Sequence, residues 1–464
     1  MLEQVKCVHM VGIGGIGMSG IAQLLHTLGY EVSGSDLVLS QSVQRLQRVG
    51  IRVYEGHDSG HLEAPDLVVV SSAVPDNNPE VVEAKRRDIP TCGRGEMLAE
   101  LALLKRSVAV AGSHGKTTTA SMVACLLEAA DFDPTAVIGG VVSAFRGNTR
   151  HGDGEFIVLE ADESDRSFLH LKPDIAVLTN IDDEHLDAYD NFDGLTGAFE
   201  EFVNRVPDTG RVVVSVDDPV LAEMAKRLGN RAVTYGLDNT AASICAQNIV
   251  LKPDGSTCLI TLCLGEVTKE SLLRLRVPGR HNVSNALAAI ATATCLGIDT
   301  AIAVNALECF TGVERRFQRY RTSNNIDVID DYAHHPTEIG AVIDTARLSS
   351  PRRLVVLFQP HRYTRTARLL TRFGEALSCA DEVLLTDVYA ASESQIEGVD
   401  AFAIAAEIKS FASIPVHVVD SMDAAITRAA ASVGPDDMLV VLGAGSIGKV
   451  ANRVVDAIER RRCS

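Results

Sequence analysis

The stretch AGSHGKTTT, residues Ala111–Thr119, follows an apolar strand pattern and precedes a helical pattern, ASMVACLLEAA. A glycine-rich turn between a strand and a helix presents backbone N–H groups to phosphate oxygens. In such a turn Lys116 places a positive charge near the β- and γ-phosphates, and Thr117 offers a hydroxyl group to Mg²⁺. The stretch therefore predicts a site for a nucleoside triphosphate. Its candidate ligand-binding residues are Gly112, Ser113, His114, Gly115, Lys116, Thr117 and Thr118.

The match to the phosphate-loop pattern GxxxxGK[ST] is incomplete, because Val110 stands where the first glycine is expected. An ordinary strand-to-helix turn without a ligand is the alternative interpretation. The strand before the loop and the helical pattern after it favour the phosphate loop.

Short β-branched runs alternate with helical patterns along most of the 464 residues, which predicts an α/β protein with parallel sheets covered by helices. The length favours about three domains. We predict a Rossmann-like domain at 1–106, a larger central domain with a parallel sheet at 107–313, and a second Rossmann-like domain at 314–464. The expected strands include Cys7–Val11, Leu67–Ser71, Ser107–Ala111, Phe156–Glu160, Ile175–Thr179, Val212–Val216, Leu354–Phe358 and Met438–Leu442.

The net charge is −18, from 43 Lys and Arg against 61 Asp and Glu, which disfavours a nucleic-acid partner. No run of about 18 apolar residues occurs, and the chain begins without a basic leader, so we expect no membrane insertion and a cytoplasmic location. The ten cysteines are scattered and form no zinc-type spacing, which indicates reduced thiols.

Two acidic runs follow predicted strands. EADESDRSF begins at Glu160, and TNIDDEHLD begins at Thr179. Parallel sheets bind ligands beyond the carboxyl ends of their strands, so both runs are expected at the same sheet edge as the phosphate loop. Glu163 and His185 are the candidate metal ligands, with Thr117. Solvated loop residues are the alternative, and a histidine is an unusual ligand for Mg²⁺.

Two further glycine patterns each resemble a dinucleotide fingerprint, GxGxxG. The first has Gly12, Gly14 and Gly17, with Asp36 at a suitable distance, and the second spans 443–448. The first turn is suited to any nucleotide diphosphate, while close helix packing explains the second without a ligand. An NAD(P)-dependent oxidoreductase and a nucleotide-sensing module without catalysis are the alternatives from other classes.

With these pieces in this order, the chain resembles the Mur ligases of peptidoglycan synthesis over essentially its whole length. The motifs that carry the resemblance are HMVGIGGIGMSGIA, SGSD, SSAVPDNNPE, AGSHGKTTT, EADESDRSFL, TNIDDEHLD, PGRHNVSNALAA, GVERRFQ, DDYAHHPTEI and FQPHRYTR. No lysine occurs between Lys172 and Lys226, whereas several members of the family carry a carbamylated lysine there. This departure favours the branch that adds L-alanine.

The resemblance implies an ATP-dependent ligase that joins L-alanine to the lactyl carboxylate of UDP-N-acetylmuramate through an acyl phosphate. It implies that ATP and Mg²⁺ are required and leaves a homodimer open. The implied UDP-sugar contacts are Gly12, Gly14, Gly15, Gly17, Asp36 and Ser72. The nucleotide contacts implied beyond the loop are His281, Asn282, Asn285 and Arg316. The implied contacts to L-alanine or the acceptor carboxylate are Tyr332, His334, His361, Arg362 and Arg365.

Within that implied reaction, Lys116 is expected to stabilise the transferring phosphoryl group and His334 to deprotonate the amine. Arg365 is expected to act beside them, since an arginine fork suits a small carboxylate. A recycling ligase that joins a murein peptide to the same sugar nucleotide is the alternative within the family.

Overall fold

The first sheet is entirely parallel, and its five strands lie in the order β3-β2-β1-β4-β5. A computed structural model of the chain describes residues 2–184, 186–264 and 267–461. The strands of this first sheet and the helices that accompany them are β1 (Cys7–Val11), α1 (Ile16–Thr27), β2 (Glu31–Asp36), α2 (Gln41–Arg48), β3 (Arg52–Glu55), β4 (Leu67–Val70), α3 (Pro79–Arg86), β5 (Thr91–Gly93) and α4 (Arg94–Ala102), with short 3-10 turns at Leu2–Gln4 and Ser59–His61. Every strand-to-helix loop therefore opens at one edge.

The second sheet has ten strands in the order β15-β14-β13-β12-β11-β10-β6-β9-β7-β8. Its elements are β6 (Arg106–Ala111), α5 (Lys116–Ala129), β7 (Thr135–Val142), β8 (Gly147–Arg150), β9 (Phe156–Glu160), β10 (Ile175–Leu178), α6 (Phe192–Asn204), β11 (Arg211–Ser215), α7 (Pro219–Leu228), β12 (Ala232–Leu237), β13 (Ile244–Lys252), β14 (Gly255–Leu264), β15 (Val267–Leu275), α8 (Arg280–Cys295) and α9 (Thr300–Glu308). The strands around β6 are parallel, which brings the ends of β6, β9 and β10 together.

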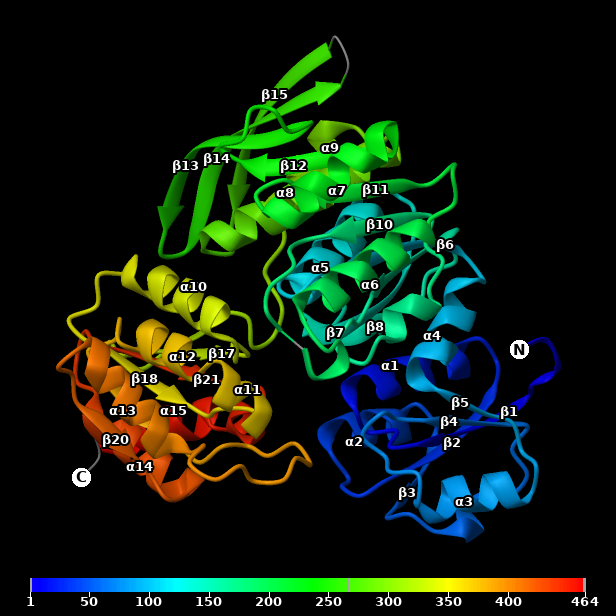
Figure 1. Cartoon of the computed structure of the whole chain (residues 1–464), viewed down its shortest axis with the longest axis horizontal. Helices are drawn as coiled ribbons and strands as arrows, with labels where there is room; N and C mark the ends of the chain where they lie inside the picture. Colours follow the sequence, from blue (N-terminus) through cyan, green and yellow to red (C-terminus); the bar gives the residue numbers. More distant parts are fainter. Residues whose placement is uncertain (1, 185, 265–266, 462–464) are drawn as a thin grey trace. The chain divides into compact units, whose positions relative to one another are not determined.

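The third sheet has six strands in the order β16-β17-β21-β18-β19-β20. Its elements are β16 (Gln318–Arg321), β17 (Asp327–Asp331), α10 (Pro336–Arg347), β18 (Leu354–Phe358), α11 (Tyr363–Arg368), α12 (Leu370–Leu377), β19 (Glu382–Leu385), α13 (Ala401–Phe411), β20 (Val416–Val418), α14 (Met422–Ser432), β21 (Met438–Leu442) and α15 (Ala451–Arg460). Each sheet with its helices can be followed in Figure 1.

The alternation of side chains along β18 shows how helices come to cover both faces of the third sheet. Val356 and its neighbours on one face pack with Ile339 of α10 and Phe373 of α12. Leu357 and its neighbours on the other face pack with Ile426 of α14 and Val454 of α15. A strand buried on both faces reads as a continuous apolar run, which is the pattern LVVLF in the sequence.

The α/β class and the parallel central strands agree with the sequence prediction, with two differences. β8 pairs with β7, and β16 pairs with β17, in antiparallel fashion. The strands β13 to β15 were not predicted. In β13 and β15, polar residues interrupt the apolar runs that mark the central strands.

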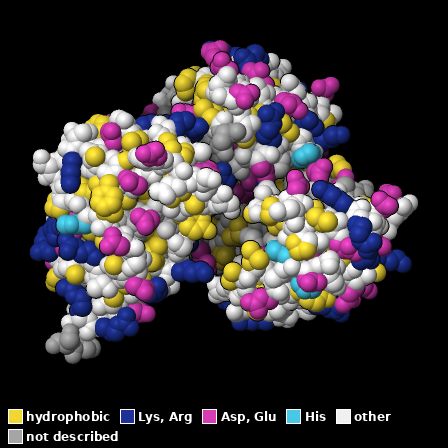
Figure 2. Space-filling view, turned by 60° about the horizontal axis from the view of Figure 1, so that its bottom comes forward, with side chains coloured by type: hydrophobic (Ala, Val, Ile, Leu, Met, Phe, Trp, Pro, Cys, Tyr) yellow, Lys and Arg dark blue, Asp and Glu magenta, His cyan; other side chains and the backbone are white. Residues whose placement is uncertain are grey.

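The chain divides into two compact units. The first unit comprises 1–247, 259–273 and 284–310, and the second comprises 248–258, 274–283 and 311–464. Basic and acidic side chains are interspersed over the face seen in Figure 2. Among the described residues, no helix is both long enough and apolar enough to cross a bilayer.

Candidate functional site

The phosphate loop joins β6 to α5 through two glycines with positive φ angles. Gly112 has φ +134°, and a Cβ atom there would lie 2.0 Å from Thr179 Oγ1. Gly115 has φ +83°, and a Cβ atom there would lie 2.6 Å from Asn285 Oδ1. Both positions therefore require glycine for backbone conformation and for close approach.

The residue that breaks the sequence pattern, Val110, does not belong to the turn. It lies within β6, is fully buried, and pairs with Glu160 of β9 and Val177 of β10. The turn starts only at Gly112, so a side chain at position 110 does not obstruct it. The mismatch thus has a structural explanation.

The loop that follows β10 holds the phosphate loop in place. Asn180 Oδ1 accepts a hydrogen bond of 2.8 Å from the backbone N–H of His114, and Thr179 Oγ1 donates one of 2.6 Å to the His114 carbonyl oxygen. The His114 ring lies 2.9 Å from an Asp182 oxygen. Sequence analysis recognised this acidic run but did not single out Thr179 or Asn180.

Lys116 begins α5 and is turned back into the loop. Its Nζ donates a hydrogen bond of 2.6 Å to the carbonyl oxygen of Gly112 and one of 2.7 Å to Oε1 of the buried Glu163. Burial alone would lower the pKa of Lys116, but Glu163 and Asp162 outweigh burial and raise it. Burial, helped by Asp162, raises the pKa of Glu163 against the opposing effect of Lys116. The lysine is therefore held as a cation where phosphate oxygens are expected.

Oxygen atoms suited to a hard cation gather beside Lys116. Thr117 Oγ1 lies 3.2 Å from Oε2 of Glu160, and Glu163 follows on the same loop. Hydroxyl and carboxylate oxygens are the donors that Mg²⁺ prefers, so the residues present fit that ion. Glu160 was not predicted as a ligand, although it opens the motif that was quoted. The other candidate ligand, His185, lies outside the described residues.

The nucleotide contacts proposed on α8 fall in different units. Asn285 belongs to the first unit, where its Oδ1 accepts a 3.2 Å hydrogen bond from Thr119 Oγ1 at the phosphate loop. His281 and Asn282 belong to the second unit, and Asn282 Nδ2 donates 2.6 Å to the Pro278 carbonyl oxygen. The structure therefore brings Asn285 to the loop within one unit.

The glycine turn of the first sheet rests against the end of β2. The Ser35 carbonyl oxygen accepts the N–H groups of Gly12 and Ile13 at 2.9 and 3.0 Å, and an Asp36 oxygen accepts the N–H of Gly14 at 2.8 Å. α1 begins directly after Gly15. The predicted Gly12, Gly14, Gly15 and Gly17 lie on one turn, Asp36 braces it, and Ser72 is exposed on the loop after β4.

Arg94, the first residue of α4, was not predicted as a site residue from the sequence. Its side chain lies beside Gly17, and its Nη2 donates to Asp162 Oδ2 at 2.9 Å and to Asp165 Oδ2 at 3.1 Å. Burial alone would raise the pKa of Asp162, but Arg94 and Lys116 outweigh it and lower the pKa to about 2. Arg94 therefore links the glycine turn to the acidic loop. One feature of the sequence could have indicated this role: Arg94 is a cation at a helix N-terminus, where the helix dipole disfavours a positive charge that has no anionic partner.

The residues that were predicted to bind the amino acid lie close together in the second unit. The His334 ring lies 5.3 Å from the Tyr332 ring and 5.7 Å from the His361 ring, and Nη1 of the buried Arg365 lies 3.3 Å from Nδ1 of His361. Arg316 lies over Tyr332, at 5.1 Å from its ring centre. Tyr389, which stacks on His361, and Glu338, whose carboxylate lies 3.4 Å from His334 Nδ1, were not predicted. Arg362 lies at the start of α11, 3.9 Å from Glu393.

The second glycine pattern, after β21, is filled by protein side chains. Arg315 Nη2 donates 2.6 Å to the Gly443 carbonyl oxygen, and a Cβ atom at Gly448 would lie 2.5 Å from Arg315 Nη1. At Gly445 a Cβ atom would lie 2.7 Å from Gln359 Oε1. The geometry favours close packing over a dinucleotide site.

Replacement of Gly112 by alanine is expected to destabilise the protein by about 1–3 kcal/mol, because alanine is strained at this φ angle and would contact Thr179 Oγ1. It is also expected to weaken ATP binding. Gly197→Ala is the matched control, since that glycine is exposed within α6 with no atom within 4 Å of its Cβ position. The control is expected to raise stability by about 0.5–1 kcal/mol. Urea unfolding compares the two, and equal stabilities would contradict the proposed constraint.

The fold and the site define the class of protein: an α/β enzyme with one glycine-rich strand-to-helix turn in each of its first two sheets. It belongs to the Mur ligase family, which makes it an ATP-dependent ligase of peptidoglycan precursor synthesis. Family models match three regions: the Mur ligase catalytic domain at 7–106, the Mur ligase middle domain at 110–293, and the Mur ligase glutamate ligase domain at 315–445.

Full-length relatives support this membership. UDP-N-acetylmuramate–L-alanine ligase of Solibacter usitatus is 46% identical over 452 residues, covering 97% of this chain and 95% of the relative. The enzyme of the same name from Methylobacillus flagellatus is 46% identical, covering 99% and 98%.

Two solved structures are similar over nearly the whole chain. A UDP-N-acetylmuramate–alanine ligase from Thermotoga maritima has a TM-score of 0.82 at 32% identity, covering 98% of this chain and 99% of that one. A murein peptide ligase from Psychrobacter arcticus has a TM-score of 0.74 at 27% identity, with the same coverage.

Proposed function

We propose that this Mur ligase joins L-alanine to the lactyl carboxylate of UDP-N-acetylmuramate, with ATP converted to ADP and phosphate. The observation that carries the proposal is the phosphate loop with Lys116 held at Glu163, in the same compact unit as the glycine turn at Gly12–Gly17. Full-length relatives of 46% identity that are named for this reaction support the choice of substrates.

A carboxylate is a poor electrophile and needs a leaving group before an amine can attack it. In the first step a lactyl carboxylate oxygen attacks the γ-phosphorus of ATP, the bond to the β-phosphate oxygen breaks, and ADP leaves. Lys116 neutralises charge on the transferring oxygens, and the amide groups of the loop orient them. Mg²⁺ held by Thr117, Glu160 and Glu163 would supply further charge neutralisation. His185 is retained as a proposed ligand.

In the second step the amine of L-alanine attacks the acyl phosphate, and phosphate leaves as the amide forms. The amine must first lose a proton, and His334 is our proposed base. Its Nδ1 lies 3.2 Å from the Tyr332 carbonyl oxygen, which fixes the ring orientation. Arg365, buried beside His361, suits the carboxylate of the amino acid.

A second candidate is the recycling ligase, favoured by the similarity to the murein peptide ligase of Psychrobacter arcticus. It would take a peptide in place of L-alanine on the same sugar nucleotide. Membership in the ligase family removes the NAD(P)-dependent oxidoreductase from consideration. We also propose a cytoplasmic location, where the ATP that the reaction consumes is available.

The decisive experiment measures ADP formation with UDP-N-acetylmuramate and ATP, in the presence of L-alanine, of a tripeptide, or of neither. We expect ADP only when L-alanine is added, together with a product heavier than the sugar nucleotide by one alanyl residue. Turnover with the tripeptide alone would select the recycling reaction. No turnover with either acceptor would refute the proposed function.

A further inference from the structure

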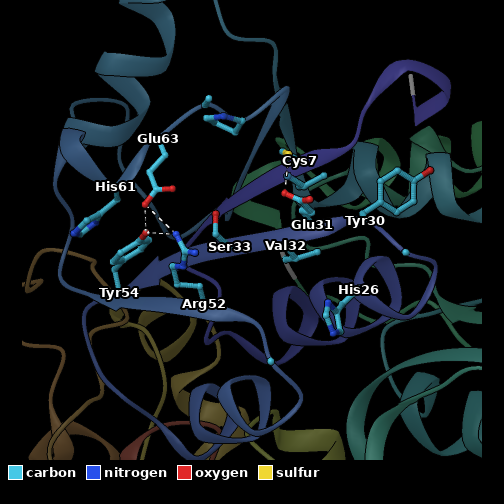
Figure 3. Close-up of a pocket in the computed structure, with 15 residues that line it drawn as sticks. Cys7, His26, Tyr30, Glu31, Val32, Ser33, Arg52, Tyr54, His61 and Glu63 are labelled. Atoms are coloured by element: carbon cyan, nitrogen blue, oxygen red, sulfur yellow. Dashed lines mark hydrogen bonds and ion pairs between the residues drawn. The ribbon is translucent and has the colours of Figure 1, made fainter.

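One face of the first sheet is lined by polar side chains from β1, β2 and β3. Towards the amino ends of these strands the face is an open hollow of about 620 Å³. Figure 3 shows Ser33 inside it and Tyr54 beside His61 at one end. The rings of Tyr54 and His61 stack with centres 4.3 Å apart. His61 thus forms the border between the open hollow and a buried part of the same face.

That buried part contains the Glu80 cluster, defined as His9, Ser35, His57, His61 and Glu80. Glu80 lies in the first turn of α3 and is fully buried. Its carboxylate lies 2.5 Å from Ser35 Oγ, 3.0 Å from His57 Nδ1 and 2.8 Å from His61 Nδ1. The Nε2 atom of His9 lies 3.6 Å from it. One carboxylate therefore contacts groups from three strands or the loops that follow them.

Glu80 is held as an anion inside the domain. Burial alone would raise the pKa of Glu80, but His9, Ser35 and His61 outweigh burial and lower the pKa to about 2. A buried charge with several partners is often no more stabilising than an apolar core of the same size. The presence of this buried cluster is therefore better explained by the positions in which it holds its members than by a contribution to the stability of the fold.

The partners of Glu80 support the carboxyl edge of the sheet. Ser35, whose hydroxyl group donates to Glu80, is also the residue whose carbonyl oxygen accepts the first two N–H groups of the glycine turn. His57 follows Gly56, whose N–H donates 2.8 Å to the Asp36 carbonyl oxygen. The buried carboxylate of Glu80 thus holds both the loop 56–61 and the end of β2.

We propose that Glu80 is a positioning residue for the nucleoside diphosphate half of the substrate. It holds Ser35 and the loop 56–61 so that the glycine turn and Asp36 keep the shape that receives a nucleoside diphosphate. The inference rests on the proposed function, which places the sugar nucleotide at this edge. Glu80 is fully buried and acts through these partners.

The test is Glu80→Gln, which keeps the side-chain size and one acceptor oxygen but removes the charge. We expect KM for UDP-N-acetylmuramate to rise about tenfold or more, while kcat and the KM values for ATP and L-alanine stay within about twofold. Glu83→Gln is the matched control on the same helix, because Glu83 pairs at the surface with Arg86. The control is expected to leave all constants unchanged.

Ser35→Ala provides a second variant in case Glu80→Gln does not fold. It removes one partner and leaves the buried carboxylate with His57 and His61, so we expect a rise of about threefold in the same KM alone. A folded Glu80→Gln or Ser35→Ala protein with unchanged KM for the sugar nucleotide, or with equal losses for all three substrates, would overturn the inference. A wild-type enzyme without activity on UDP-N-acetylmuramate would instead refute the proposed function.

Discussion

Replacement of Lys116 by alanine is expected to reduce ADP formation by at least about 10³-fold, because Lys116 is the only lysine or arginine in the sequence Gly112–Thr118 and is proposed to neutralise charge on the transferring phosphoryl group. Lys116 Nζ lies 2.6 Å from the Gly112 carbonyl oxygen and 2.7 Å from Glu163, so its charge is held inside the loop. Binding of UDP-N-acetylmuramate, measured by calorimetry without ATP, is expected to be unchanged. That separation follows because the glycine turn lies on a different sheet.

Lys226→Ala is the control for this prediction. Lys226 lies on α7, in the same unit, and pairs at the surface with Glu223. The control should retain full activity. Substantial ADP formation by the Lys116→Ala enzyme would show that the phosphate loop is not the ATP site, and loss of sugar-nucleotide binding in it would show that the two sites are not separate.

Replacement of Glu163 by glutamine is expected to lower kcat by about 10²-fold or more and to raise the Mg²⁺ concentration needed for half-maximal activity about tenfold or more. The amide cannot neutralise a cation, and it also leaves Lys116 without its buried anionic partner. The measurement is ADP formation as a function of Mg²⁺ concentration at saturating ATP. A Mg²⁺ dependence equal to that of the wild type would exclude Glu163 as a ligand.

Glu155→Gln serves as the control for the Glu163 variant. Glu155 immediately precedes β9, the strand that ends at Glu160, and it pairs at the surface with Arg106. Exposed pairs of this kind contribute about 0–1 kcal/mol, so its removal should change neither activity nor Mg²⁺ dependence. A matching defect in both variants would mean that general loss of negative charge, and not ligation, causes the effect.

Local patterns in the sequence were sufficient to locate the two glycine-rich turns. The phosphate loop and the turn at Gly12–Gly17 each lie between a strand and a helix, as predicted, because a tight turn with positive φ angles needs glycine whatever surrounds it. The α/β class also follows from local periodicity, since apolar runs separated by helical patterns build parallel strands. The roles assigned to the individual site residues stay predictions, and His185 lies outside the described residues.

Contacts between distant segments were not predictable in the same way. Arg94 and Asp162 are separated by 68 positions, and Ser35 and Glu80 by 45, yet each pair is joined by a direct hydrogen bond. Neither pair has a local signature that names its partner. Glu160 and Asn180 likewise acquire their positions only when β9 and β10 align on either side of β6.

By itself, the sequence determined the fold class, the places of the glycine turns, and the resemblance that identified the family, because these depend on residue types at short, regular spacings. Only the tertiary structure decided that Val110 lies outside the phosphate loop, that Arg315 and Gln359 fill the second glycine turn, and that Glu80 supports the first one. The physical reason is that hydrogen bonds and close contacts act over a few ångströms in space. Which residues come that close depends on the register and order of the strands.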